Sequence, residues 1–157
     1  MRWTAIVTGA DRPTGIAVSS ALSAAGASVV LAAEDAQALV ELAAKLVAAG
    51  GHAVAVPTDL TSPISVRRLV EQTLGAFGRF DAAFNDGPVA LALRYQVPPM
   101  RRAGTGAIVN LAHDQAVVDL SRSAARESGV RIEAVGPGVD VDAIVDSLRS
   151  GVAIRRT

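Results

Sequence analysis

Cysteine is missing from this chain of 157 residues, and histidine, lysine and aromatic side chains are scarce. Without cysteine there is no disulfide framework, thiolate metal site or cysteine nucleophile. Two histidines are too few for a histidine-based zinc site, so we expect no metal. Only Lys45 and Tyr95 are available for chemistry that needs a lysine or a tyrosine.

The chain also lacks an excess of either charge, because 15 basic residues balance 15 acidic ones. Nucleic-acid binders usually carry a strongly basic face, so the balance argues against a nucleic-acid partner. No apolar run reaches the roughly 18 residues of a membrane span, and the start has no long apolar signal segment. We therefore expect a soluble, cytoplasmic protein without a membrane partner.

What the chain does contain is an alternation of short apolar runs with stretches of helical period. Near-continuous apolar runs are typical of buried parallel strands. The alternation predicts an α/β fold, a doubly wound, Rossmann-like parallel sheet of about six strands with helices on both faces. We expect one domain over residues 1–150 and a tail over 151–157. The expected strands are 4–8, 28–32, 52–56, 80–84, 107–111 and 130–135.

Helices are expected between these strands. Asp35 and Ser62 are in position to cap two of them, and Pro63 to open the second. A further helix is expected from Asp114 to about Ser128, where apolar residues form one stripe. Prolines and glycines crowd residues 87–106 and leave room only for a short helix over 89–97.

A glycine turn from Gly9 to Gly15 leads from the first strand into a helix. Such turns let backbone amides approach a pyrophosphate, although a simple tight turn has the same appearance. Further motifs follow in order: VAVPTDLT at 54–61, FGRFDAAFN at 77–85, GAIVN at 106–110, residues 116–127, and GVRIEAVGPG at 129–138. With this ordered series the chain resembles the short-chain dehydrogenase/reductase family over about residues 3–140.

The resemblance implies a dinucleotide site at the carboxyl ends of the strands. Glu34 could accept a hydrogen bond from a ribose hydroxyl and would repel the extra phosphate of NADP, which favours NAD. Asp59 and Asn85 could instead be ordinary turn residues. The cofactor contacts that the resemblance implies are Gly9, Arg12, Gly15, Ile16, Glu34, Asp59, Leu60, Asn85 and Gly87.

The chain departs from the family pattern at this same turn. Five residues separate Gly9 from Gly15 where the family motif has three, and Ala17 stands at the third glycine. Pro13 in the longer loop would crowd the pyrophosphate, and the Ala17 methyl would lie where helix and strand pack closely. We therefore expect a weakened cofactor site.

The catalytic pattern departs further. Members of the family use a Tyr-x-x-x-Lys pair, in which the tyrosine exchanges a proton with the substrate and the lysine lowers its pKa. Here Pro99 follows Tyr95 by four places, and Lys45 lies fifty positions before the tyrosine. Alignment puts Asn110 and Asp114 at the pair's positions. His113, Asp114 and Asn110 are the remaining weak catalytic candidates.

Three functional hypotheses follow. The first is a non-catalytic partner subunit or regulator of an active dehydrogenase, a homo- or hetero-oligomer formed through the helix at 114–128. In the family two helices form a dimer bundle, and the first of them is expected to be mostly deleted here. The second is an NAD(P)-dependent short-chain oxidoreductase that uses non-standard residues for proton transfer, with His113 as the candidate. The third is a cofactor-free lyase, isomerase or cyclase on the same scaffold.

Overall fold

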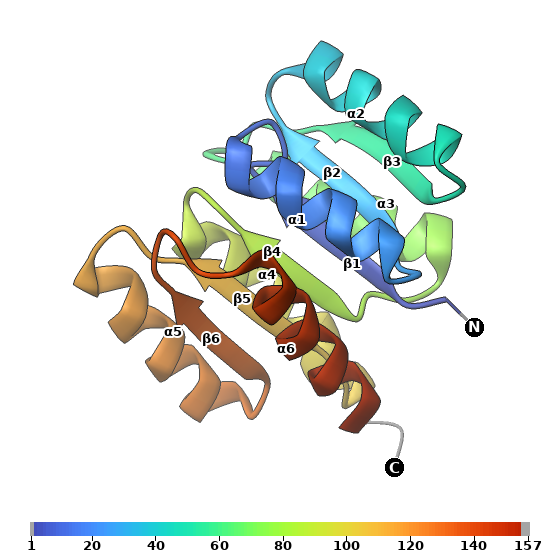
Figure 1. Cartoon of the computed structure of the whole chain (residues 1–157). Coiled ribbons are helices and arrows are strands. Elements are labelled where there is room, and N and C mark those ends of the chain that lie inside the picture. The colour runs from blue at the N-terminus through green and yellow to red at the C-terminus, as the bar shows by residue number, and fades with distance from the viewer. Residues whose placement is uncertain (1, 155–157) are drawn as a thin grey trace.

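Six parallel strands form one sheet in the order β3-β2-β1-β4-β5-β6 in the computed structural model, which describes residues 2–154 (Figure 1). The strands are β1 Thr4–Thr8, β2 Ser28–Ala33, β3 His52–Pro57, β4 Ala82–Asn85, β5 Ala107–Leu111 and β6 Arg131–Val135. The helices are α1 Pro13–Ala24, α2 Ala36–Ala48, α3 Pro63–Phe77, α4 Val89–Ala103, α5 Gln115–Ser128 and α6 Val141–Ile154. The predicted doubly wound α/β fold is confirmed.

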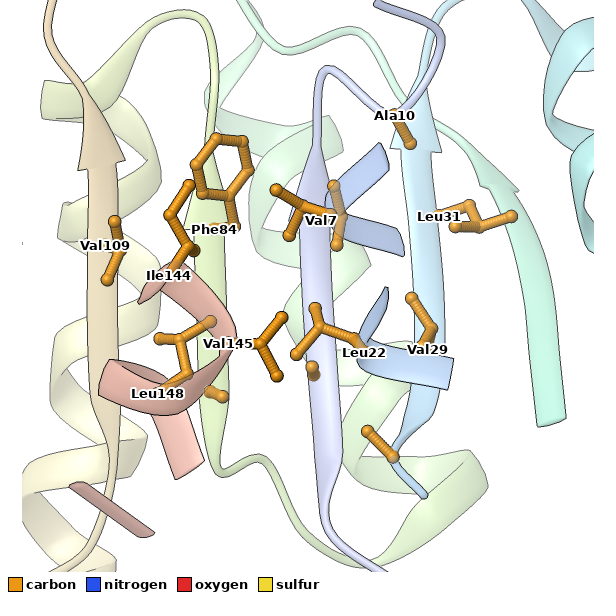
Figure 2. Packing of buried hydrophobic residues seen from close by; sticks show 14 of the residues in the cluster. Val7, Ala10, Leu22, Val29, Leu31, Phe84, Val109, Ile144, Val145 and Leu148 are labelled. Carbon is orange, nitrogen blue, oxygen red and sulfur yellow. The ribbon is translucent and has the colours of Figure 1, made fainter. Parts of the chain in front are cut away.

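Each face of the sheet has its own apolar core, because successive side chains of a strand point to opposite faces. Val7 of β1 lies in one core and Ile6 in the other. The first core receives Leu22 of α1, Leu39 of α2 and Leu148 of α6, so these three helices cover that face. Figure 2 shows Val7, Phe84 and Val109 of three strands beneath Ile144, Val145 and Leu148 of α6.

Helices α3, α4 and α5 cover the second face. Leu69 of α3 and Leu93 of α4 are buried there against Ile6 and Ile108, whereas Leu120 of α5 is only partly buried. Ser121 is the one residue of α5 that is fully buried. Helix α5 therefore lies along the sheet with much of its apolar side uncovered. Within the described part of the chain, no helix is long and apolar enough to cross a membrane.

The helix starts follow the sequence signals. The carboxylate of Asp35 accepts a hydrogen bond from the Ala38 amide at 3.1 Å. The hydroxyl of Ser62 accepts one from the Ser65 amide at 3.3 Å. Both bonds satisfy amide groups that a helix leaves without internal partners, so the two expected caps are confirmed.

Helix α4 is longer than the sequence predicts. It runs on through Pro98 and Pro99 to Ala103, and the left-handed Gly104, with φ +70°, ends it. Two prolines cost backbone hydrogen bonds, but Gln96 and Met100 on either side of them are fully buried and hold the helix on the sheet. The expectation that the first bundle helix is mostly deleted is therefore wrong.

Helix α6 is the element that sequence reasoning missed. It continues to Ile154, so residues 151–154 are helical rather than part of the expected tail. Val152 is 5% exposed and lies in the first core, and Gly151 packs so closely on Ala107 that a Cβ would collide with it. The last part of the expected tail, 155–157, lies outside the described residues.

Candidate functional site

The candidate site lies where the strand order reverses, outside the carboxyl ends of β1 and β4. Because β1 pairs with β2 on one side and β4 on the other, the loops that follow these strands diverge and leave a crevice. The Gly9 turn follows β1, Glu34 follows β2, Asp86 follows β4, and His113 lies just after β5. The fold therefore gathers most of the candidate residues at one edge of the sheet.

The glycines of the first turn are required by contacts inside the protein. Gly9 has φ +71°, and a Cβ there would collide with the backbone oxygen of Asp86. A Cβ on Gly15 would collide with the backbone oxygen of Gly9. Close packing of turn, strand and helix accounts for both residues whether or not a ligand binds.

Ala17 does not have the effect expected from the sequence. It is exposed on α1, and Gly15 is the residue that packs against the strand turn. The Ala17 methyl therefore leaves helix packing undisturbed. Ile16, an expected cofactor contact, is 41% exposed near the start of the same helix. It presents an apolar surface beside the crevice.

A hollow of about 280 Å³ adjoins the turn. The residues that line it come from the turn after β1, the end of β2, the loop between β3 and α3 and the loop after β4, and they include Gly9, Arg12, Glu34 and Leu60. Asp11 adds a second carboxylate, so two acids and one arginine line this space. Gly87, with φ +148°, lies near Leu60.

The carboxylate of Asp59 is used in a turn. Its Oδ1 accepts hydrogen bonds from the Thr61 hydroxyl at 2.6 Å and the Thr61 amide at 3.0 Å. These two bonds hold the pKa of Asp59 below its usual value of 3.8, and the bond from the Thr61 hydroxyl has the larger effect. A contact with Glu34 lowers the pKa further. The structure thus shows the turn role that the sequence left open.

Asp86 is a central residue of the site that sequence reasoning did not single out. Its side chain is 5% exposed, and its Oδ1 lies 3.4 Å from both Arg12 Nη1 and His113 Nε2. Arg12 and His113 are 57% and 60% exposed. One buried carboxylate therefore holds two exposed basic side chains above the ends of β1, β4 and β5. A signal was present, since Asp86 directly follows a buried strand.

Asn85 and Asn110 belong to a buried polar network. The side-chain Nδ2 of Asn85 donates hydrogen bonds to Gln96 Oε1 at 2.8 Å and to Asn110 Oδ1 at 3.0 Å. Its Oδ1 accepts hydrogen bonds from Gln96 Nε2 and from the Thr8 hydroxyl. Asn110 in turn donates to the Ser121 hydroxyl at 3.0 Å. Both asparagines are at most 1% exposed. The network joins β1, β4, β5, α4 and α5.

This network changes the meaning of two expected site residues. Every polar side-chain atom of Asn85 is bonded to protein, so it has none to offer a cofactor. Asn110 has 0% exposure and cannot touch a substrate in the crevice. Asp114, the third weak candidate, caps α5 by accepting from the Val117 amide at 3.1 Å. Among the three catalytic candidates, His113 is neither buried nor used as a helix cap: its side chain is 60% exposed at the crevice edge, with Nε2 3.4 Å from Asp86 Oδ1.

Lys45 and Tyr95 do not meet. Lys45 is exposed on α2, whose buried leucines belong to the first core. Tyr95 lies on α4 and packs against the second core, with the Arg94 guanidinium 5.4 Å from its ring centre. The whole sheet lies between α2 and α4 (Figure 1).

Comparison with known proteins agrees with the fold. The short chain dehydrogenase family model matches residues 3–89. A 1-deoxy-11-beta-hydroxypentalenate dehydrogenase from Streptomyces arenae is 38% identical across 69% of this chain but only 40% of its own length. A 2,5-dichloro-2,5-cyclohexadiene-1,4-diol dehydrogenase from Sphingobium indicum is 33% identical across 86% of this chain and 71% of its own length.

Solved structures extend the likeness. A short-chain type dehydrogenase/reductase from Mycobacterium marinum superposes with a TM-score of 0.80 at 27% identity, covering 87% of this chain and 74% of that one. A metagenomic short-chain oxidoreductase in complex with NADP gives 0.78 at 26% identity, covering 92% and 87%. The chain spans about two fifths of the Streptomyces relatives that it matches. On its matching family model, sequence relatives and fold, the chain belongs to the short-chain dehydrogenase/reductase family.

Proposed function

We propose that this chain is a non-catalytic member of its family that acts by association, as a partner subunit or regulator of a catalytically complete dehydrogenase. The observation that carries the proposal is the placement of Lys45 and Tyr95 on opposite faces of the sheet. A Tyr-x-x-x-Lys mechanism needs both side chains at one site. The scaffold is kept while the proton-transfer pair is not, which favours a binding role.

The face through which the chain would associate is that of α5. Its apolar residues Val117, Leu120 and Ala124 pack on the second core but stay partly exposed. Helix α4 lies beside it, and a hollow of about 290 Å³ between the two is lined by Leu93, Leu120 and other residues. Apolar surface of this kind gains free energy when a partner covers it.

The dinucleotide site is compatible with NAD as a bound group. Gly9 lets the backbone approach, Arg12 can meet a phosphate, and Glu34 can accept a hydrogen bond from a ribose hydroxyl. Such a cofactor would supply or take a hydride in a catalytic relative. The two carboxylates of the hollow, Glu34 and Asp11, favour NAD over NADP.

Light scattering tests the association. The pure chain and the chain co-expressed with a complete relative, such as the Streptomyces arenae dehydrogenase, are measured after gel filtration. We expect a complex of defined mass that a Leu120→Lys variant fails to form, while the exposed Arg149→Ala on the opposite face forms it normally. A stable monomer that captures no relative contradicts the proposal.

One observation supports a second candidate, an NAD-dependent oxidoreductase with a non-standard proton carrier. His113 Nε2 lies 3.4 Å from the buried Asp86 carboxylate, and an imidazole can exchange protons near neutral pH. Calorimetric titration with NADH and NADPH separates the candidates. Absence of binding heat removes the oxidoreductase, whereas turnover that His113→Ala abolishes establishes it. The third hypothesis, a cofactor-free lyase, isomerase or cyclase, would use Asp114 beside His113. The Asp114 carboxylate instead caps α5, so no observation supports that hypothesis.

A further inference from the structure

The sheet has two free edges, and they differ in character. Strand β6 forms one edge and carries the charged residues Arg131 and Glu133. Strand β3 forms the other edge, and its sequence HAVAVP contains no Asp, Glu, Lys or Arg. Charged side chains are a usual protection of an edge strand against pairing with another chain. Strand β3 lacks this protection.

The backbone groups on the outer side of β3 belong to Ala53 and Ala55. Strand β3 runs parallel to β2, and the Thr58 amide donates to the Ala33 oxygen at 2.9 Å. Since successive residues direct their backbone groups to opposite sides of a strand, Ala53 and Ala55 direct their amide and carbonyl groups away from the sheet. Pro57 has no amide and ends this row. The edge thus offers a short row of donors and acceptors to a further strand.

Exposed apolar side chains gather around the same edge. Among the described residues, five large apolar side chains are exposed, and three of them, Val40, Val47 and Val54, lie on α2 and β3. Their exposed fractions are 58%, 53% and 39%. Helix α2 and strand β3 adjoin at one end of the sheet (Figure 1). Single exposed apolar residues are ordinary, but a cluster on adjoining elements indicates a contact surface.

The valines of α2 point beyond the edge. Val40 and Val47 each follow a buried leucine of α2 by one position. In a right-handed helix that runs against the strands after a right-handed crossover, this step turns a side chain away from α1 and toward the free side of β3. Ala44 lies on the same flank, whereas Glu41 and Lys45 lie on the side of α2 that faces away from the sheet. Val40, Ala44, Val47 and the outer side of β3, with Val54, form what we call the β3-edge surface.

The β3-edge surface is complementary to itself. A twofold axis perpendicular to the sheet would place Ala53 of each copy opposite Ala55 of the other, so that each such pair makes both of its backbone hydrogen bonds. Val54 would meet Val54 of the second copy at the axis, and the two α2 helices would lie side by side with their valine flanks in contact. The surface itself contains no charged side chain, so no like charges oppose this contact.

We propose that two copies of this chain join their sheets edge to edge through the β3-edge surface. The inference goes beyond the proposed function, which uses α5. Helix α5 packs beside β6, at the opposite end of the sheet from β3 (Figure 1). One chain can therefore use both surfaces at the same time.

The size of the contact sets its expected strength. Helix α2 has 13 residues and β3 has 6, and each is about 20 Å long. A contact of that length, one helix and one sheet deep, buries on the order of 1,000 Å² over both copies, which is near the lower limit for a specific dimer. We therefore expect a dimer that dissociates on dilution.

Sedimentation equilibrium of the whole chain over a range of concentrations tests the proposal. We expect a reversible equilibrium between monomer and dimer. Ala55→Pro removes an outward amide and leaves the bonds to β2 in place, and it is expected to weaken the dimer at least about tenfold. Val40→Lys/Val47→Lys places like charges in the helix contact and is expected to have an effect of the same size.

Each variant has a matched control. Ala134→Pro alters an outward residue of β6, the other edge of the sheet, and Ile64→Lys alters an exposed residue of α3. Both are expected to dimerise as the wild type does. Leu120→Lys on α5 is also expected to leave this dimer intact, so failure of the α5 association and failure of the edge contact are distinguishable. Circular dichroism verifies that each variant is folded.

Two results overturn the inference. One is a chain that stays monomeric at the highest concentration measured, and the other is a dimer that Ala55→Pro leaves intact. Hydrogen exchange adds a direct readout of the strand pairing, because the amides of Ala53 and Ala55 are expected to exchange more slowly as the concentration rises. Exchange rates at these two amides that do not change with concentration also contradict the proposal.

Discussion

Lys45 and Tyr95 are separated by the central sheet, with Lys45 on the outer surface of α2 and Tyr95 on α4 against the opposite core. No side-chain motion brings them together, because the buried strands β1, β2 and β4 lie between the two layers. The crevice at the strand ends therefore does not bring Lys45 and Tyr95 together. What remains there is the cluster of Arg12, Asp86 and His113.

Arg12 is expected to contribute to NADH binding more than to stability. Its guanidinium lines the hollow beside Glu34. The Arg12 side chain is 57% exposed, so solvent screens its ion pair with Asp86, and losing the pair costs no more than about 1 kcal/mol of folding free energy. Calorimetry of Arg12→Ala is expected to show weaker NADH binding with a nearly unchanged melting temperature. Arg68→Ala on α3 is the control, and equal affinities in both variants would contradict the prediction.

Asn85 is expected to be a structural residue. Asn85→Ala removes the side chain that bonds Gln96, Thr8 and Asn110, and leaves these three buried side chains without that partner. Since unpaired buried polar groups are costly, the free energy of unfolding is expected to fall by at least about 2 kcal/mol. Urea denaturation measures the change, with the exposed Gln72→Ala on α3 as the control. A loss as small as that of the control would show that the network relaxes or takes in water.

The sequence predicted the fold because its main signals are local. Apolar runs, the caps at Asp35 and Ser62 and the glycine turn all act over a few residues. The sequence did not predict the full length of α4. The burial of Gln96 and Met100 stabilises this helix despite its two prolines, and burial is a property of the tertiary structure. The site behaved the same way: Asp86 gained its importance from Arg12 and His113, which lie 74 and 27 residues away in sequence.

Helix α6 supplies a test of the fold's least predictable element. Leu148 is fully buried in the first core, so Leu148→Ala is expected to lower the free energy of unfolding by about 2–5 kcal/mol through lost burial and a cavity. Arg149→Ala, exposed on the same helix, is expected to have little effect. Chemical denaturation compares the two. Equal stabilities would mean that α6 does not pack on the sheet as described.

Asp59 offers a pH-dependent prediction. Its hydrogen bonds from Thr61 hold its pKa below 3.8, so the stabilisation they give is present above that pH and is lost as the pH falls through the folded-state pKa. Thr61→Val keeps the amide but removes the hydroxyl, and the pKa of Asp59 is expected to rise toward 3.8. NMR titration of the carboxyl carbon measures it. A pKa that stays low would assign the effect to other groups.

The central claim is tested most directly by turnover of the isolated chain. Purified protein is mixed with NAD and a panel of secondary alcohols that includes cyclohexanol, the substrate in the name of one relative, and NADH formation is followed. The account predicts no NADH above a protein-free blank, and identical traces for Tyr95→Phe and Lys45→Met. Steady NADH production that His113→Ala abolishes would contradict it and establish the chain as an enzyme.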